Sequence, residues 1–238
     1  MQNIKVILWL ITGLLCSNLA AQDLSYSKPG NTFYKELANP VETNTKEWAR
    51  ISQTINVSFA SDNVRYAKEK VPLVPLQNLW EVKAWKGEKV HTQILVWTKK
   101  DIAELSFKLD DLIDENENRI PLESIEAAFV RYTMADDFGG GCAARDLSID
   151  DSSLVADPID IIDRMPVRAN TVRPVWLSIR VPGNIPTGIY TGSIIINATE
   201  KHELKISLNV LDHILPPPAQ WSYDFDYLAV SCPHCKDS

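Results

Sequence analysis

Apolar and polar residues alternate with a period of two along seven segments of the chain. In the clearest segment, residues 203–211, leucine, isoleucine and valine occupy every second position, and lysine, serine and asparagine stand between them. Such alternation is typical of a strand with one buried face and one solvated face. The predicted strands cover residues 51–59, 89–97, 103–109, 127–132, 174–181, 190–197 and 203–211.

The last two predicted strands form a hairpin signal. Residues 190–197 alternate in the same way as residues 203–211, and the polar stretch 198–202 between them can close an antiparallel hairpin. Several short strands separated by proline and glycine, with few helical signals, predict an all-β fold, namely an antiparallel β-sandwich.

One short helix is expected over residues 157–163. Asp157 fits the N-cap position and Pro158 the first helical position. Asp160 would then lie near the positive end of the helix dipole.

The N-terminus predicts a targeting segment. Lys5 supplies a positive charge, residues 6–15 are apolar, and the small residues Ala20 and Ala21 follow. We therefore expect a signal peptide over residues 1–21 and export to the periplasm, the cell surface or the medium. The apolar run is shorter than the roughly 20 residues that a spanning helix needs, so no stable membrane span is expected.

The rest of the chain divides by its pattern. Residues 22–47 are polar and without a period, as in a leader or linker, and residues 48–215 carry the strand pattern of one sandwich domain. The chain has 238 residues, of which 45% are hydrophobic, enough for a core. Its net charge of −7, without a cluster of lysine or arginine, argues against nucleic acid as a partner.

The cysteines do not predict a disulfide framework. Three of them, Cys142, Cys232 and Cys235, follow the signal segment, and an odd number cannot pair completely. Cys232 and Cys235 flank Pro233 and His234, as in oxidising thiol oxidoreductases. That chemistry needs a following helix to stabilise the thiolate, and only three residues follow; a fourth zinc ligand is not evident either.

Residues 114–118 place carboxylates and amides at alternate positions, as a calcium loop does. Arg119 stands where such a loop needs glycine, and Ile125 stands where it needs glutamate. A solvated turn between strands is the favoured interpretation. We expect no catalytic residue, no metal site and no cofactor in this chain.

The seven tryptophans include candidates for contact with a sugar. Trp97 and Trp176 lie in strongly apolar strands and are expected in the core. Trp80 and Trp85 lie near lysines and are the candidates for exposure and for glycan contact.

Several blocks of sequence, in order, resemble the N-terminal domain of glycoside hydrolase family 123. The similarity runs from about residue 48 to residue 221. The blocks are residues 84–88 (AWKGE), 93–97 (QILVW), 129–132 (FVRY), 171–177 (TVRPVWL) and the Pro-x-Gly-x-Tyr-x-Gly motif of residues 186–192.

The resemblance implies a β-sandwich that precedes a (β/α)₈ catalytic barrel. Characterised family members are β-N-acetylgalactosaminidases that use an adjacent Asp-Glu pair in the barrel. A barrel takes roughly 250 residues, and 17 follow Trp221, so we expect the barrel to be missing from this chain. The pair Asp114-Glu115 lies in the sandwich region and is not expected to be the catalytic pair.

Residues 216–238 are expected to be the start of the catalytic domain, frameshifted after about residue 226. From Tyr227 the sequence departs from the family pattern. One permitted choice of codons, read one base later, gives Ile-Trp-Gln-Ser-Pro, the expected kind of continuation.

Two functions remain open at this point. The first is a non-catalytic N-terminal sandwich of an exported glycoside hydrolase whose parent activity is hydrolysis of terminal β-N-acetylgalactosaminides. The alternative is a free-standing exported carbohydrate-binding or interaction module, which would need Trp80 and Trp85 exposed on one face.

Overall fold

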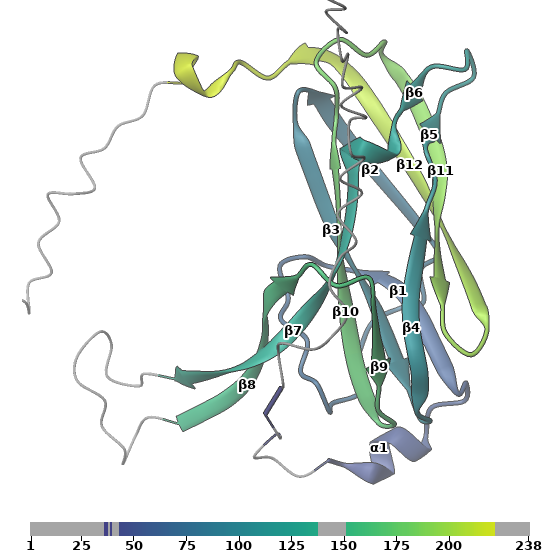
Figure 1. Cartoon of the computed structure of the whole chain (residues 1–238), viewed down its shortest axis with the longest axis vertical. Helices are drawn as coiled ribbons and strands as arrows, with labels where there is room; N and C mark the ends of the chain where they lie inside the picture. Colours follow the sequence, from purple (N-terminus) through teal and green to yellow (C-terminus); the bar gives the residue numbers. More distant parts are fainter. Residues whose placement is uncertain (1–35, 38, 40–42, 138–150, 222–238) are drawn as a thin grey trace, which may run out of the picture.

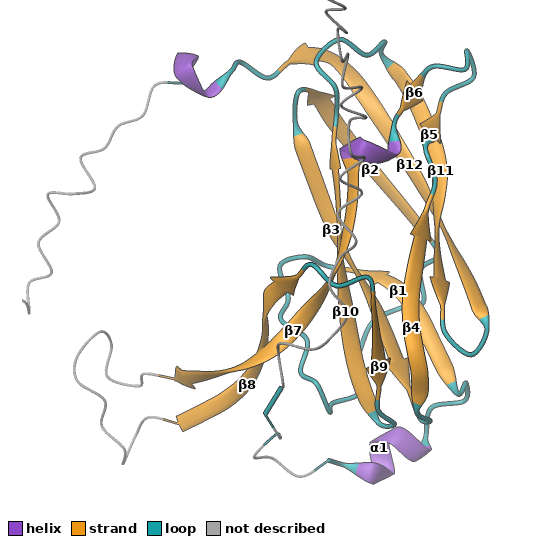
Figure 2. Ribbon diagram, in the orientation of Figure 1, coloured by secondary structure: helices purple, strands orange, loops and turns teal. Residues whose placement is uncertain are grey.

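The computed structural model describes residues 36–37, 39, 43–137 and 151–221, which form two packed β-sheets (Figures 1 and 2). The first sheet has the order β1 (Ile55–Ala60), β3 (Lys89–Thr98), β10 (Thr171–Arg180), β7 (Ile125–Asp137), β8 (Asp151–Asp160). The second has the order β2 (Leu79–Lys86), β12 (Lys201–Ile214), β11 (Gly188–Asn197), β4 (Ile102–Leu109), β9 (Arg164–Val167). Two short strands, β5 (Leu112–Ile113) and β6 (Arg119–Ile120), extend the second sheet beside β11.

The predicted fold class is confirmed, and each of the seven predicted strands is present. The hairpin of β11 and β12 is antiparallel, with Tyr190 opposite Leu208 and Ile194 opposite Leu204. One pair departs from the antiparallel pattern, because β2 runs parallel to β12. Strands β2, β5, β6, β8 and β9 were not predicted from the sequence.

The helix predicted over residues 157–163 is wrong. Asp157 and Asp160 lie in β8, which pairs with β7 with Asp160 opposite Phe129. Instead of capping a helix, these carboxylates form ion pairs with arginines: Asp157 with Arg65 at 2.8 Å and Asp160 with Arg131 at 2.9 Å. The one short α-helix among the described residues is α1 (Thr45–Ala49).

The main core lies between the two sheets. In β12 the side chains at positions 204, 206, 208 and 210 are buried, as the alternation predicts. Rings from the two sheets meet in this layer, with the centroids of Phe107 in β4 and Phe129 in β7 5.2 Å apart. Burial of this apolar surface is the main source of the stability of the sandwich.

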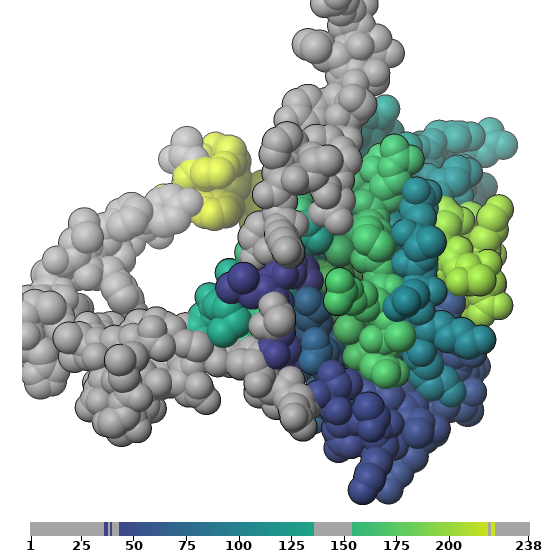
Figure 3. Space-filling model, turned by 60° about the horizontal axis from the view of Figure 1, so that its bottom comes forward, coloured from purple at the N-terminus to yellow at the C-terminus, as the bar shows by residue number. Residues whose placement is uncertain are grey.

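The outer face of the first sheet is also covered. Leu95 and Trp97 point away from the main core and pack with Trp48 of α1 in a second apolar cluster. The Trp48 indole donates a hydrogen bond to the carbonyl oxygen of Glu69 at 3.0 Å, which fixes the connection between β1 and β2. Figure 3 shows this N-terminal part, in purple and blue, gathered at one end of the molecule. Coverage on both faces explains why β3 is buried almost continuously from Val90 to Thr98.

A buried ion pair ties the N-terminal segment to this outer face. Arg173 of β10 donates hydrogen bonds to both carboxylate oxygens of Glu36, at 2.6 and 2.9 Å, and Lys68 lies 2.9 Å from Glu36 Oε2. Burial by itself raises the pKa of Glu36, but the hydrogen bonds and charges of Arg173 and Lys68 outweigh it and lower the pKa to about 2. The segment expected to be a leader therefore supplies a buried anchor.

The Pro-x-Gly-x-Tyr-x-Gly motif has a structural explanation. Tyr190 is buried, and its hydroxyl donates a hydrogen bond to the carbonyl oxygen of Pro186 at 2.9 Å. Gly188 has a φ of 151°, which L side chains rarely adopt. At Gly192 an added Cβ would lie 2.5 Å from Leu112 Cδ2, so glycine permits the close approach of β5. The motif shapes the start of β11.

Candidate functional site

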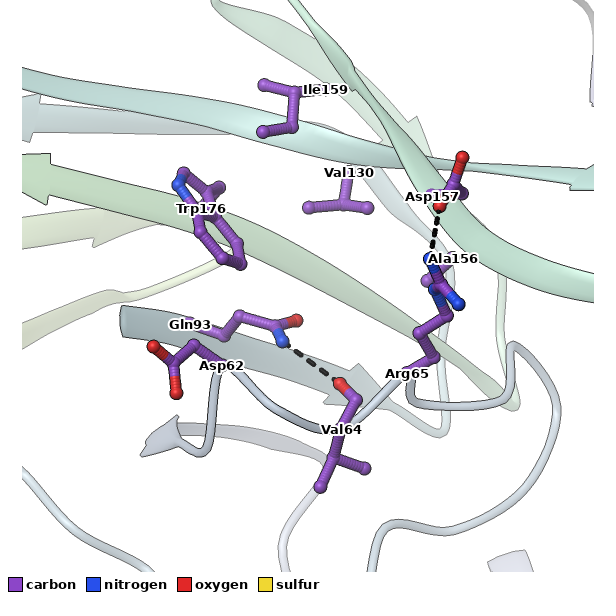
Figure 4. Close-up of a pocket in the computed structure, with 9 residues that line it drawn as sticks. All are labelled: Asp62, Val64, Arg65, Gln93, Val130, Ala156, Asp157, Ile159 and Trp176. Carbon is purple, nitrogen blue, oxygen red and sulfur yellow. Dashed lines mark hydrogen bonds and ion pairs between the residues drawn. The ribbon is translucent and has the colours of Figure 1, made fainter. Parts of the chain in front are cut away.

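A pocket of about 240 Å³ opens on the outer face of the first sheet (Figure 4). Its walls come from strands β3, β7, β8 and β10 and from the connection between β1 and β2. The lining residues are Asp62, Val64, Arg65, Gln93, Val130, Ala156, Asp157, Ile159 and Trp176. Apolar and polar side chains therefore face the same small space.

Trp176 and Gln93 are cross-strand neighbours on the floor of the pocket. They are directly paired in the antiparallel register of β10 and β3. The half-buried indole of Trp176 is held by the ring of His91, which stacks on it at a centroid distance of 4.8 Å and an angle of 25°. A side chain of the same sheet therefore holds the indole in place in the absence of a ligand.

The side-chain amide of Gln93 is oriented by its hydrogen bonds. Only 5% of the residue is exposed, and its Nε2 donates to the carbonyl oxygens of Ser61 at 3.1 Å and Val64 at 3.0 Å. An amide has two N–H donors, so both are used, and the flipped amide would place an acceptor against two acceptors. The oxygen of Gln93 therefore lies on the other side, toward the centre of the pocket (Figure 4).

Charged groups stand at the rim. Asp62 Oδ2 lies 3.2 Å from His91 Nε2, and Arg65 Nη2 lies 2.8 Å from Asp157 Oδ1. The side chains of Arg65 and Asp157 are 70% and 51% exposed, so this pair bridges the connection and β8 in solvent. An arginine has five N–H donors and a carboxylate about four acceptor sites. Arg65 and Asp62 therefore keep capacity for a ligand.

A second pocket, of about 490 Å³, adjoins the first at Asp62. It lies where the edge strands β1 and β2 of the two sheets meet, and its lining includes Trp80, Glu81 and His91. The Trp80 ring lies 6.2 Å from that of Phe59, centroid to centroid, and packs against the main core. Asp62 and His91 thus form a ridge between two pockets that each contain a tryptophan.

The two tryptophans selected from the sequence do not lie together. Even positions of β2, including Trp80, face the core, whereas odd positions, including Trp85, face outward. Trp85 is 41% exposed and stacks on His213 at 5.5 Å. The single face required by the free-standing binding module is not formed by this pair, and contact of either residue with a glycan stays a prediction.

Of the tryptophans expected in the core, Trp97 is buried and Trp176 is not. Trp176 alternates with the buried Val175 and Leu177 and so points to the outer face, where it lines the first pocket. The alternation in β10 could have placed it outside the core. The position of Trp176 beside Gln93 depends on the pairing of β10 with β3, and no local pattern in the sequence indicates that pairing.

The turn at Asp114 is confirmed as a structural turn. Asp114 Oδ1 accepts hydrogen bonds from the backbone N–H groups of Asn116 at 2.9 Å and Asn118 at 2.8 Å, and Oδ2 accepts one from the Asn118 amide at 2.8 Å. The Asn118 side-chain bond is the main cause that lowers the pKa of Asp114. The carboxylate is therefore occupied by its own turn.

Some of the sequence features lie outside the described residues. These are the signal segment, the triad Cys232, His234 and Cys235, Cys142 and the residues after Trp221. In the ranges that the structure covers, no group of three or more histidine, cysteine, aspartate or glutamate side chains is arranged to hold a metal ion. Nor does any helix in those ranges have the length and apolar character to cross a membrane.

Comparison with protein families gives a match over residues 59–198, more than half of the chain, to a model described as "Glycoside hydrolase 123 N-terminal domain". The matched range begins near the end of β1 and ends just after β11, so it includes strands β2 to β11 of the two sheets but not β12. A search of curated proteins found no match.

Among solved structures, a family 123 glycoside hydrolase from Clostridium perfringens, studied for glycolipid glycan hydrolysis, is similar with a TM-score of 0.63 and 24% identity. The similarity covers 70% of this chain and 29% of that enzyme, so it shows the fold and spans less than a third of the enzyme. The Escherichia coli adhesin CfaE matches with a TM-score of 0.33 and 12% identity over 69% of this chain and 49% of its own, too weak a similarity to support an argument.

Proposed function

We propose, because the chain belongs to the glycoside hydrolase 123 N-terminal domain family, that its sandwich is the non-catalytic N-terminal module of an exported glycoside hydrolase. The observation that supports this most directly is the family match at residues 59–198, which includes strands β2 to β11 of the two sheets. In this proposal, the catalytic domain that follows the sandwich in the parent protein catalyses the hydrolysis.

The proposed parent activity is hydrolysis of terminal β-N-acetylgalactosaminides. The resemblance to family 123 supports it, and the C. perfringens enzyme that shares the fold was studied for glycolipid glycan hydrolysis. The arrangement of the acidic residues is consistent with a supporting role for the sandwich. Asp114, of the adjacent Asp114-Glu115 pair, is hydrogen-bonded within its turn, whereas a catalytic carboxylate must be available to the substrate.

The link to a catalytic domain is tested at the level of DNA. We propose that the reading frame changes near residue 226, so that DNA covering codons 220–238 and the region after them encodes a barrel in the next frame. A next-frame sequence without a strand-and-helix alternation of barrel type would contradict this part of the proposal.

Export is tested separately. Expression of the full chain with residues 1–21 in a Gram-negative host should place the protein in the periplasm, and N-terminal sequencing should show cleavage after Ala21. Retention of an uncleaved chain in the cytoplasm would contradict the proposed export.

A further inference from the structure

We propose that the pocket on the outer face of the first sheet, around Trp176, binds a single pyranose ring. This goes beyond the proposed function, because a module that only supports a catalytic domain needs no ligand of its own. The chemistry of the lining, its rigidity and the size of the pocket all suit such a ligand.

The lining matches the two chemical aspects of a sugar ring. A pyranose has an apolar face of C–H groups and an edge of hydroxyls that both donate and accept hydrogen bonds. Trp176 offers an aromatic surface, and Val130 and Ile159 continue the apolar wall (Figure 4). Gln93, beside Trp176, offers an acceptor, and Arg65 offers donors from the other side of the pocket.

The acceptor on Gln93 is the most informative group. The residue is 95% buried, both of its amide hydrogens are held by backbone carbonyl oxygens, and its own oxygen faces the pocket. An acceptor that is oriented in this way and faces the pocket is available to a donor from a ligand or from water. A sugar hydroxyl is a suitable donor.

The charges disfavour an anionic ligand. The positive charge of Arg65 is already compensated by Asp157 at 2.8 Å, and Asp62 adds a further carboxylate at the rim. A phosphate or carboxylate would meet a net negative lining, whereas a neutral ligand with hydroxyl groups would find both donors and acceptors.

Size limits the ligand to one ring. The volume of about 240 Å³ is below the roughly 300–1,000 Å³ of pockets for drug-sized molecules. Further rings of an oligosaccharide could extend across the Asp62–His91 ridge toward Trp80 in the adjoining pocket. The primary subsite nevertheless lies at Trp176.

The test uses the full chain labelled with ¹⁵N and follows its tryptophan indole N–H signals by NMR. The probes are methyl β-D-galactopyranoside, methyl β-D-glucopyranoside and methyl 2-acetamido-2-deoxy-β-D-galactopyranoside. We expect at least one of them to give a saturable shift of the Trp176 signal, identified by its absence in Trp176→Phe. An affinity in the millimolar range is expected for one small ring.

Two variants and a control locate the subsite. Trp176→Ala and Arg65→Glu should each weaken binding about tenfold or more, because one loses the aromatic face and the other the donors. Arg65 is exposed, so Arg65→Glu should fold normally. Its affinity for the sugar therefore tests the subsite even if Trp176→Ala does not fold. Trp221→Ala removes an exposed indole that lines neither pocket and should leave affinity unchanged.

Three results would overturn the proposal: no saturable shift at Trp176 with any probe, unchanged affinity in Arg65→Glu, or loss of binding in Trp221→Ala. None of these results bears on whether the chain hydrolyses a glycoside or on the reading frame, so failure of the subsite and failure of the proposed function are distinguishable.

Discussion

Arg173 donates two parallel hydrogen bonds to Glu36, from Nη1 to Oε1 at 2.6 Å and from Nη2 to Oε2 at 2.9 Å. The arginine side chain is 4% exposed and the glutamate side chain 9%, so both charges are removed from water. Such a bidentate pair has strict geometry. It therefore fixes the N-terminal segment at one point on β10.

Removing the carboxylate should destabilise the sandwich. Glu36→Ala leaves Arg173 buried without its counter-ion, and loss of one partner of a buried pair costs about 3 kcal/mol of unfolding free energy. Urea denaturation followed by tryptophan fluorescence measures the change. The control is Glu47→Ala, whose exposed carboxylate accepts only a hydrogen bond from Asn44 and should change stability little.

The same pair predicts a dependence of stability on pH. The pKa of Glu36 is about 2 in the folded chain and near 4.5 for a free glutamate, so the folded state binds fewer protons between these values. Stability from this group is present above pH 4.5 and is lost as the pH falls toward 2. The unfolding free energy of Glu36→Gln should fall less steeply over that interval, and equal slopes in the two proteins would refute the assignment.

Gly192 should not tolerate a methyl group. In Gly192→Ala the new Cβ would lie 2.5 Å from Leu112 Cδ2 and 2.9 Å from the carbonyl oxygen of Asp111, so β5 must shift. Overpacking of this kind costs about 1–3 kcal/mol. Gly183→Ala, where no atom lies within 4 Å of the added Cβ, is the matched control in thermal denaturation. Equal melting temperatures for the two variants would contradict the account of the motif.

Alanine substitutions of Asp114 and Glu115 should differ in their effect on thermal stability. Asp114→Ala removes three hydrogen bonds that close the turn and should lower the melting temperature, whereas Glu115→Ala should leave it unchanged. Circular dichroism at increasing temperature makes the comparison. A stable Asp114→Ala variant would show that the turn forms without its carboxylate.

Local periodicity was sufficient to predict most of the strands that form the core, although the unpredicted β2, β5, β6 and β9 also contribute buried residues to it. Residues 203–211 have one apolar face and one polar face, and that pattern alone fixes which side chains of β12 are buried. The edge strand β8 was missed because its acidic residues suit a helix N-terminus equally well. Its identity as a strand depends on pairing with β7 and on Arg65 and Arg131, which are distant in sequence.

The candidate pocket could be predicted only in part. Alternation places Trp176 on the face of β10 opposite to Val175, but nothing local indicates that this outer face is only partly covered. The pocket exists because the connection between β1 and β2 returns over β3 and leaves the space between Gln93 and β8 open. Such long-range juxtapositions follow from topology rather than from any short stretch of sequence.

A hydrolysis assay shows whether this chain is a non-catalytic family 123 module. The purified full chain is incubated with 4-nitrophenyl β-N-acetylgalactosaminide, beside an active β-N-acetylgalactosaminidase under the same conditions. The account predicts no release of 4-nitrophenol above the buffer blank at any concentration of the chain. Release that increases in proportion to the chain and disappears after heat denaturation would contradict it.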